Sequence, residues 1–155
     1  MIHFLLIANM QGQVRLARHY PHSGLSAEQA AVDHADIIRK AVSRSSKQSS
    51  FFAYGSGIIV CFRRYASLYF MIGVDDGDNE LAALELIQLM VEALNTYFND
   101  VTELDIMLRL ELVHIIIDEV IANGHVVDAN QANILRPLKL MATHAGPCHP
   151  EQWTR

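Results

Sequence analysis

The chain has 155 residues, of which 51% are hydrophobic and 19% are charged, and its formal net charge is −5. This length supports one domain with its own core, and the mildly acidic balance gives no electrostatic reason to expect nucleic-acid binding. Two cysteines, Cys61 and Cys148, do not make a disulfide framework. Residues 48–62, the longest uncharged run, are too short and too rich in Ser and Gly to span a membrane. We therefore expect a cytosolic globular protein that contacts membranes only indirectly.

The first elements are predicted to be two strands. Residues 2–8 are almost continuously apolar, which is typical of a strand buried on both faces. Residues 9–12 end in a glycine and favour a hairpin turn, and residues 14–20 then form the return strand. Because side chains alternate along a strand, Val14 and Leu16 are expected to share one face.

A helix and a polar loop follow these strands. Residues 26–43 carry a broad apolar stripe at helical spacing, and Ser26 with Gln29 matches a capping box. Residues 44–50 are polar, basic and rich in serine. We interpret this loop as a solvated connector rather than a phosphorylation site.

The middle of the chain is predicted to be a strand, turn and helix unit. Residues 51–54 and 57–63 form a hairpin, and residues 67–74 add a fifth strand. A long amphipathic helix then runs to residue 98, with Asp78 as its N-cap. Its core-facing residues are expected to be Leu81, Leu84, Ile87, Val91, Leu94 and Phe98.

The second half is predicted to be helical. Thr102 and Asp105 match a capping box at the start of one helix that ends at Asn123-Gly124. A last helix covers residues 130–141, and Pro137 is expected to kink or end it. The apolar stripe of the longer helix comprises Leu104, Met107, Leu108, Leu112, Ile115, Ile116, Val120 and Ile121.

The end of the chain, residues 143–155, is predicted to be a flexible tail. His144, Cys148 and His149 in this tail are possible metal ligands, but structural zinc sites normally use four. The sequence has no Gly-rich phosphate loop, nucleophile elbow or HExxH motif. We therefore expect no metal, no cofactor and no enzymatic activity.

The order of elements is β-β-α-β-β-β-α-α, which predicts an α+β fold. The hairpins favour a five-stranded, mainly antiparallel sheet packed between helices. No internal repeat or second domain is visible, so residues 1–142 are predicted to form a single domain.

Long stretches of the chain resemble a known family. Residues 63–98, RRYASLYFMIGVDDGDNELAALELIQLMVEALNTYF, are similar to the signature of the small (sigma) subunits of heterotetrameric clathrin-adaptor-type coat complexes. The similarity continues through residues 101–138 and includes the opening strands, residues 1–20. The second half most closely resembles the sigma subunit of the fourth adaptor complex.

This resemblance implies a longin-like fold and a non-enzymatic role in intracellular protein transport. The chain would stabilise the core of its complex by binding a large solenoid subunit and, through the complex, a second large and a medium subunit. It would be cytoplasmic and peripheral on Golgi, trans-Golgi or endosomal coated vesicles. The alternatives are a small subunit of another coat, such as coatomer zeta or another sigma, and a free-standing longin-type regulator of a small GTPase or tether.

The resemblance also implies a site for acidic dileucine sorting signals in cargo tails. An apolar slot would be lined by Ala66, Leu68, Val91, Val101 and Ile106, with Asp100 at its rim and Arg15 as the cation. The alternative is that the apolar residues are ordinary core and that Arg15 is a solvated strand residue. Asp100 departs from the uncharged Asn of the family's best characterised site, and its carboxylate would oppose an acidic peptide.

A second expected site is the contact with the large subunit. The resemblance places it on the strand residues Phe62, Arg63, Arg64 and Tyr65 and on the helix that carries His114 and Ile117. Arg and Tyr are favoured at protein interfaces. The alternative is that the helix residues lie under neighbouring helices of the same chain.

Overall fold

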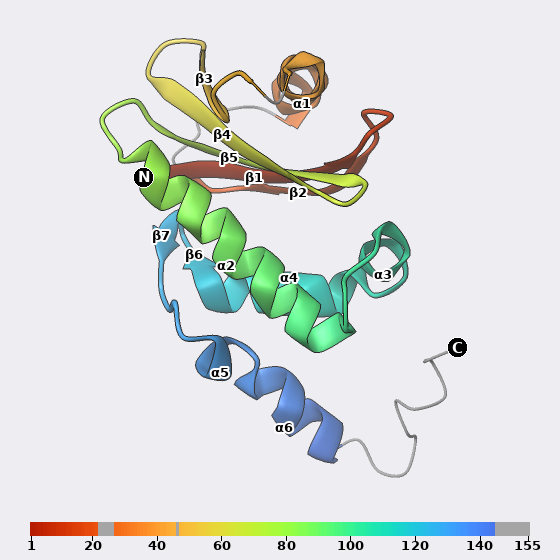
Figure 1. The fold of residues 1–155 in the computed structure, drawn as a ribbon. Helices are drawn as coiled ribbons and strands as arrows, with labels where there is room; N and C mark the ends of the chain where they lie inside the picture. The colour runs from red at the N-terminus through yellow and green to blue at the C-terminus, as the bar shows by residue number, and fades with distance from the viewer. Residues whose placement is uncertain (22–26, 46, 145–155) are drawn as a thin grey trace.

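The computed structural model describes residues 1–21, 27–45 and 47–144. Its centre is a five-stranded sheet in which neighbouring strands, in the order β2-β1-β5-β4-β3, are antiparallel. Helix α1 covers one face of the sheet, and α2 and α4 cover the other (Figure 1). The predicted α+β fold with an antiparallel sheet between helices is confirmed.

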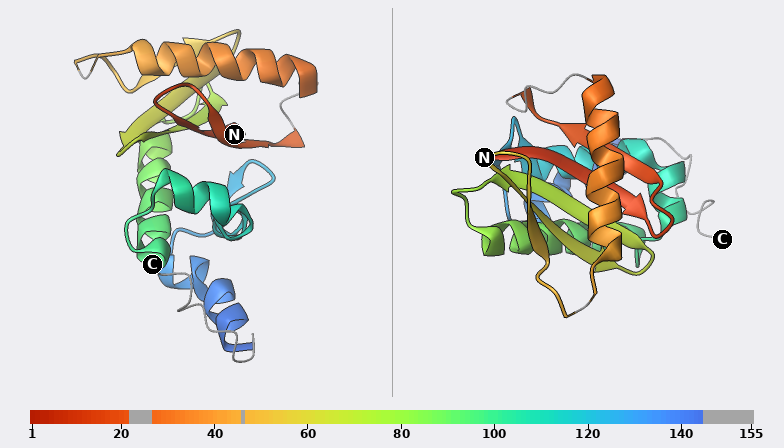
Figure 2. Two further views of the ribbon diagram at one scale, coloured as in Figure 1. Left: turned by 90° about the vertical axis from the view of Figure 1, so that its right-hand side faces the viewer. Right: turned by 90° about the horizontal axis from the view of Figure 1, so that it is seen from above.

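The bounds of the elements follow the predicted order closely. The strands are β1 (Ile2–Asn9), β2 (Val14–His19), β3 (Phe51–Tyr54), β4 (Ile58–Tyr65) and β5 (Leu68–Asp75), with a small hairpin of β6 (Ile121–Ala122) and β7 (His125–Val126). The helices are α1 (Ala27–Ser43), α2 (Glu80–Phe98), α3 (Glu103–Leu108), α4 (Leu110–Val120), α5 (Gln131–Ile134) and α6 (Arg136–His144). Seen from above, α1 runs across the strands (Figure 2). The predicted cap Ser26 and most of the predicted tail lie outside the described residues.

Alternation along the central strand β5 divides the interior into two cores. Leu68, Phe70 and Ile72 face α2 and α4, whereas Tyr69 and Met71 face α1. The larger core lies on the α2 side, because two helices and the C-terminal segments pack there. This is the core that contains the predicted slot.

The first hairpin confirms one prediction and corrects another. Strand β1 is buried and pairs on both sides, as its apolar run predicted. The pairing steps from Ile7↔Leu16 to Ala8↔Val14, so Arg15 has no partner on β1 and forms a bulge. The bulge breaks the alternation, so Val14 is exposed while Leu16 is buried.

The start of α2 differs from the prediction by one residue. Asn79, not Asp78, is the N-cap, because its side-chain oxygen accepts hydrogen bonds from the backbone N–H groups of Leu81 and Ala82. The helix therefore begins at Glu80, and Leu81 is turned outward and is 68% exposed. By length and composition α2 is able to span a membrane, but much of its apolar surface is buried in the domain core.

The prediction of a single helix after Thr102 is wrong. The predicted capping box of Thr102 and Asp105 is present, but the helix breaks at Arg109, where φ is −128° and ψ is 42°. The side chain of Arg109 bonds to Asp105 and lies over the ring of Phe98, 4.6 Å from its centroid. Arg109 is therefore both the C-cap of α3 and the N-cap of α4.

The other predicted helix ends also shift. Helix α4 ends at Val120, and Asn123-Gly124 forms the turn of the β6–β7 hairpin rather than a helix stop. The predicted last helix is two helices, α5 and α6, which meet at Leu135. Pro137 is the second residue of α6, where its missing N–H has no intrahelical acceptor to lose.

Candidate functional site

The structure brings the apolar residues of the predicted slot together, but it leaves no open slot. Leu68 from β5, Val91 from α2, Val101 from the loop before α3 and Ile106 from α3 belong to one buried cluster, and each is at most 3% exposed. In this conformation they are core, which was the alternative reading of the pattern. A peptide needs a rearrangement to insert its leucines there.

The two remaining residues of the predicted slot lie at the surface. Ala66 and Asp100 are both exposed and both adopt left-handed backbone conformations, with φ of 51° and 71°. Ala66 is in the β4–β5 turn, and Asp100 is in the loop between α2 and α3. The rim position predicted for Asp100 is therefore compatible with its exposure.

Asn95 fixes the loop that carries Asp100. Its amide donates a 2.8 Å hydrogen bond to the hydroxyl of Tyr65 at the end of β4. Its side-chain oxygen accepts the backbone N–H of Val101 at 3.0 Å, and its carbonyl accepts the N–H of Asp100 at 3.2 Å. One half-buried residue of α2 thus joins the sheet, the loop and the entry to α3.

Arg15 is not a solvated cation in this conformation. Its Nε donates to Oε1 of Glu103, the first residue of α3, over 2.7 Å, and its Nη2 donates to Gln13 over 2.7 Å. Asn9 also donates to Oε1 of Glu103, over 3.0 Å. The hydrogen bond from Asn9, followed by that from Arg15, lowers the pKa of the Glu103 carboxyl below its usual value.

The residues predicted to contact a large subunit are divided between core and surface. Phe62 packs into the α1-side core, and Ile117 packs into the α2-side core. Arg63 points to α2, where its Nη1 donates to Gln88 over 2.8 Å, whereas Arg64 is exposed. His114 is half-buried, and burial together with nearby Arg18 lowers the pKa of its ring.

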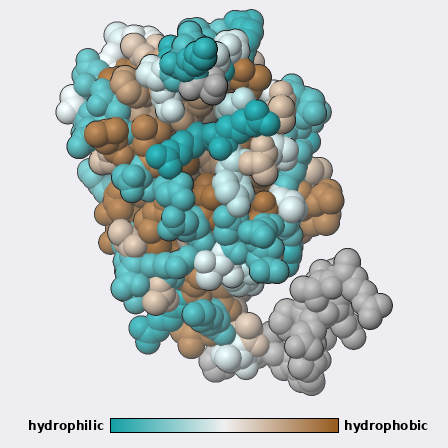
Figure 3. Space-filling view, viewed as in Figure 1, coloured by the Kyte–Doolittle hydropathy of each residue, from teal (hydrophilic) through white to brown (hydrophobic). Residues whose placement is uncertain are grey.

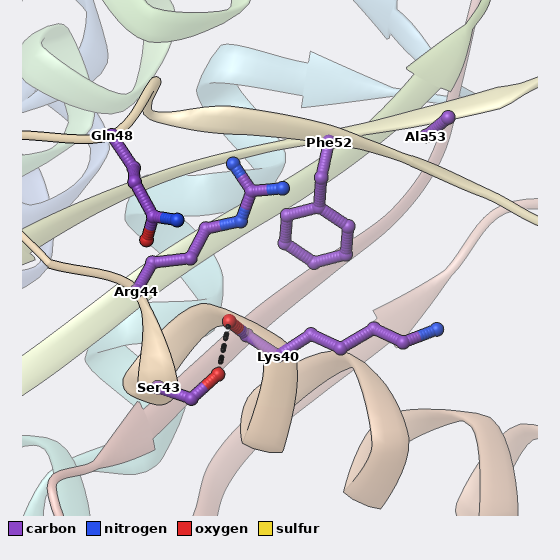
Figure 4. A pocket seen from close by; sticks show the side chains of 6 residues that line it. All are labelled: Lys40, Ser43, Arg44, Gln48, Phe52 and Ala53. Carbon is purple, nitrogen blue, oxygen red and sulfur yellow. Dashed lines mark hydrogen bonds between the residues drawn. The ribbon is translucent and has the colours of Figure 1, made fainter.

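Two other surface features are formed by residues outside the predicted slot. On α3, Leu104 is 63% exposed and Leu108 is 76% exposed, and hydrophobic surface is visible at the position of this helix (Figure 3). An open depression of about 410 Å³ lies between the end of α1 and β3, where the Arg44 guanidinium lies over Phe52 (Figure 4). This depression is lined by two cations, Lys40 and Arg44, so it does not fit a pair of leucines.

Within residues 1–21, 27–45 and 47–144, no cluster of three or more His, Cys, Asp or Glu side chains is placed to hold a metal ion.

The five-stranded antiparallel sheet, with one helix on one face and two on the other, defines a small longin-type domain. Residues 1–145 match the family described as clathrin adaptor complex small chain, and the chain belongs to that family.

Individual relatives agree with this assignment. The chain is 46% identical over 140 residues to the AP-4 complex subunit sigma of Arabidopsis thaliana, covering 90% of this chain and 96% of that protein. It is 42% identical over 141 residues to the AP-4 complex subunit sigma-1 of Homo sapiens, covering 91% and 96%. A chain in a homology model of the full-length AP-3 complex in a stretched open conformation superposes with a TM-score of 0.71 at 28% identity, covering 94% and 95%. The family and the similarity to the sigma subunit of the fourth complex, both inferred from the sequence, are confirmed.

Three residues that shape the site were missed by the sequence reasoning. Asn9 lies in the predicted hairpin turn, and Glu103 and Asn95 lie within predicted helices without any role of their own. Asn9 and Glu103 are 94 positions apart, so no local pattern joins them.

Proposed function

We propose that this chain is the small subunit of a heterotetrameric vesicle-coat adaptor complex of the AP-4 type. Its part is to stabilise the core of the complex by binding a large solenoid subunit, which links it to a second large and a medium subunit. The complex works in the cytoplasm, at the surface of Golgi, trans-Golgi or endosomal vesicles, in cargo sorting. The observation that carries this proposal is membership of the small-chain family over nearly the whole chain.

The surface of the chain supports a partner-bound state. Exposed apolar side chains on α3, such as Leu104 and Leu108, are the kind of surface that a bound partner covers. Arg64 and the half-buried Tyr65, at the end of β4, are of the types favoured at interfaces. Phe62 and Ile117 contribute by supporting this surface from within, because their side chains are buried in this chain.

The second part of the proposal is recognition of acidic dileucine signals in cargo tails. The apolar residues gathered around Ile106 would receive the two leucines after α3 moves, and Arg15 would receive the acidic residue. Burying a leucine contributes about 1.5–3 kcal/mol before ordering costs, so a single motif is expected to bind at about micromolar strength at best. The proximity of Arg15 to α3 supports this arrangement, because Glu103 of that helix binds it directly.

The test is affinity capture of the tagged full chain from its native cytosol, followed by mass spectrometry of the bound proteins. Recovery of two large chains and one medium chain in equal amounts is the expected result, and their identities assign the complex. Recovery of coatomer chains or of another adaptor's chains would reassign the coat. Recovery of a small GTPase or a tether without these chains would overturn the proposal and favour a free-standing regulator.

A further inference from the structure

The β1–β2 turn of this chain is built to hold a carboxylate. Asn9 is only 3% exposed, and its Oδ1 accepts the backbone N–H groups of Gln11 at 3.1 Å and Gln13 at 2.9 Å. These bonds fix the side chain, and its Nδ2 donates to Oε1 of Gln13 at 2.9 Å and to Oε1 of Glu103 at 3.0 Å. Arg15, placed in the bulge, adds its guanidinium to the same oxygen of Glu103. The side-chain donors of Asn9 and Arg15, both placed by the β1–β2 hairpin, therefore converge on one carboxylate oxygen.

The carboxylate that fills this turn belongs to the helix that closes the slot. Glu103 is the first residue of α3, and the fully buried Ile106 lies one turn further along the same helix. The side chains of Arg15 and Glu103 are 21% and 25% exposed, so solvent and a ligand are able to reach the pair. The contacts of Glu103 join the start of α3 to the β1–β2 turn, and Val101 and Ile106, on either side of Glu103, are buried in the core.

The other acidic side chain of α3 is already engaged elsewhere. Asp105 bonds to the N–H and hydroxyl of Thr102 and to Arg109. It therefore takes part in the helix cap and not in the turn. Glu103 is the carboxylate of α3 that meets Arg15.

We propose that Glu103 is a built-in competitor for the acidic residue of a dileucine peptide. Binding exchanges the carboxylate of Glu103 for that of the peptide at Arg15 and Asn9, and it releases α3 from the position that closes the slot. This inference rests on the proposed peptide-binding function. It assigns to Glu103 the control of affinity and of the preference for an acidic residue.

The experiment compares wild type, Glu103→Gln and Glu111→Gln in the full chain, bound to the large chain that it captures. The matched control, Glu111, is an exposed carboxylate on α4, and its substitution changes the net charge equally. Two fluorescent peptides are titrated: one with Glu four positions before Leu-Leu, and one with Gln in that place. A partly exposed ion pair is worth up to about 1 kcal/mol, so Glu103→Gln is expected to bind the acidic peptide about fivefold more tightly. The affinity for the neutral peptide should rise less than this, and Glu111→Gln should bind both peptides as wild type does.

The outcomes separate this inference from the function on which it rests. Suppose that the peptides bind wild type, but that Glu103→Gln binds the acidic peptide more weakly or prefers it over the neutral peptide by the same ratio as wild type. Glu103 then orients Arg15, and the inference is overturned. If neither peptide binds any variant, the peptide-binding function is wrong and the inference falls with it. Hydrogen exchange of the amides of residues 103–108 gives an independent reading, because losing the charge weakens the contact and should speed their exchange in Glu103→Gln and not in Glu111→Gln. Unchanged exchange would overturn the role of Glu103 in holding α3.

Discussion

Asn95 and Tyr65 join the last turns of α2 to the end of β4 through a 2.8 Å hydrogen bond, although they are 30 positions apart. The same Asn95 side chain also accepts the N–H of Val101, immediately before α3. The loop between these points contains Asn99 and Asp100 in left-handed conformations, which non-glycine residues adopt at a cost. Asn95 therefore stabilises the loop in which the predicted rim residue lies.

Replacing Asn95 is expected to destabilise the domain more than removing the Tyr65 hydroxyl. Asn95→Ala removes two side-chain hydrogen bonds and leaves a backbone N–H without its acceptor, so we expect a loss of about 2 kcal/mol in the free energy of unfolding. Tyr65→Phe removes one of these bonds and should cost about 1 kcal/mol. Urea denaturation of the two variants tests this order. Equal losses would mean that the bond to Val101 contributes nothing.

Gly73 is required by the ring of Phe4. A Cβ at this position on β5 would lie 2.3 Å from Cε1 of Phe4, inside the core on the α1 side. Gly73→Ala is therefore expected to cost about 3 kcal/mol through overpacking. Gly77→Ala is the matched control, because no atom lies within 4 Å of a Cβ there, and it should change stability by about 0.5 kcal/mol or less. A stable Gly73→Ala protein would show that Phe4 moves aside easily.

Stability is expected to fall in mild acid because of the stacked pair His19 and His34. Their rings are 4.7 Å apart and their Nε2 atoms are 2.6 Å apart, which requires one ring to donate and the other to accept. Burial lowers the pKa of both rings below the usual 6.5, and for His34 the neighbouring His19 lowers it further while Asp33 opposes the shift. As the pH falls, the unfolded chain therefore takes up protons before the folded chain does. The stability that the neutral histidine pair contributes is present above about pH 6.5 and is lost as the pH falls below it.

The measurement is the urea midpoint at about pH 5.5 and about pH 7.5. Wild type should have the lower midpoint at the acidic pH, and His34→Phe, which keeps a ring but does not titrate, should show a smaller difference. His125→Gln, on the exposed β7, serves as the control and should behave as wild type. A His34→Phe protein with the full wild-type difference would assign the effect to other groups, of which His114 is the first to test.

The sequence predicts this fold well where a pattern has one physical solution. A continuous apolar run as in β1 must be buried on both faces, and the side chains of Thr102 and Asp105 form their cap locally. The break at Arg109 is different, because the apolar spacing continues from Leu108 to Leu112 without interruption. At the break Arg109 contacts Phe98, and this contact exists only in the folded domain, so the local sequence gives no signal for it.

The candidate site is less predictable for a related reason. Apolar residues such as Val91 and Ile106 have the same pattern whether they line a slot or fill a core. Their burial depends on the position of α3, and one contact of α3 is the distant pairing of Glu103 with Arg15. A pairing between positions so distant leaves no periodic signal in the sequence.

The last prediction concerns Asp100, whose carboxylate is expected to weaken binding of an acidic peptide. Asp100→Asn should raise the affinity for such a peptide about twofold to threefold at low salt, and the gain should shrink as salt screens the charge. Asn is also tolerated in the left-handed conformation of this residue, so stability should not change. Peptide titration at two salt concentrations tests this, with a neutral peptide as the control. If Asp100→Asn has no effect while Arg15→Ala weakens binding, the acidic residue binds at Arg15 but away from Asp100; if neither substitution matters, the peptide binds elsewhere.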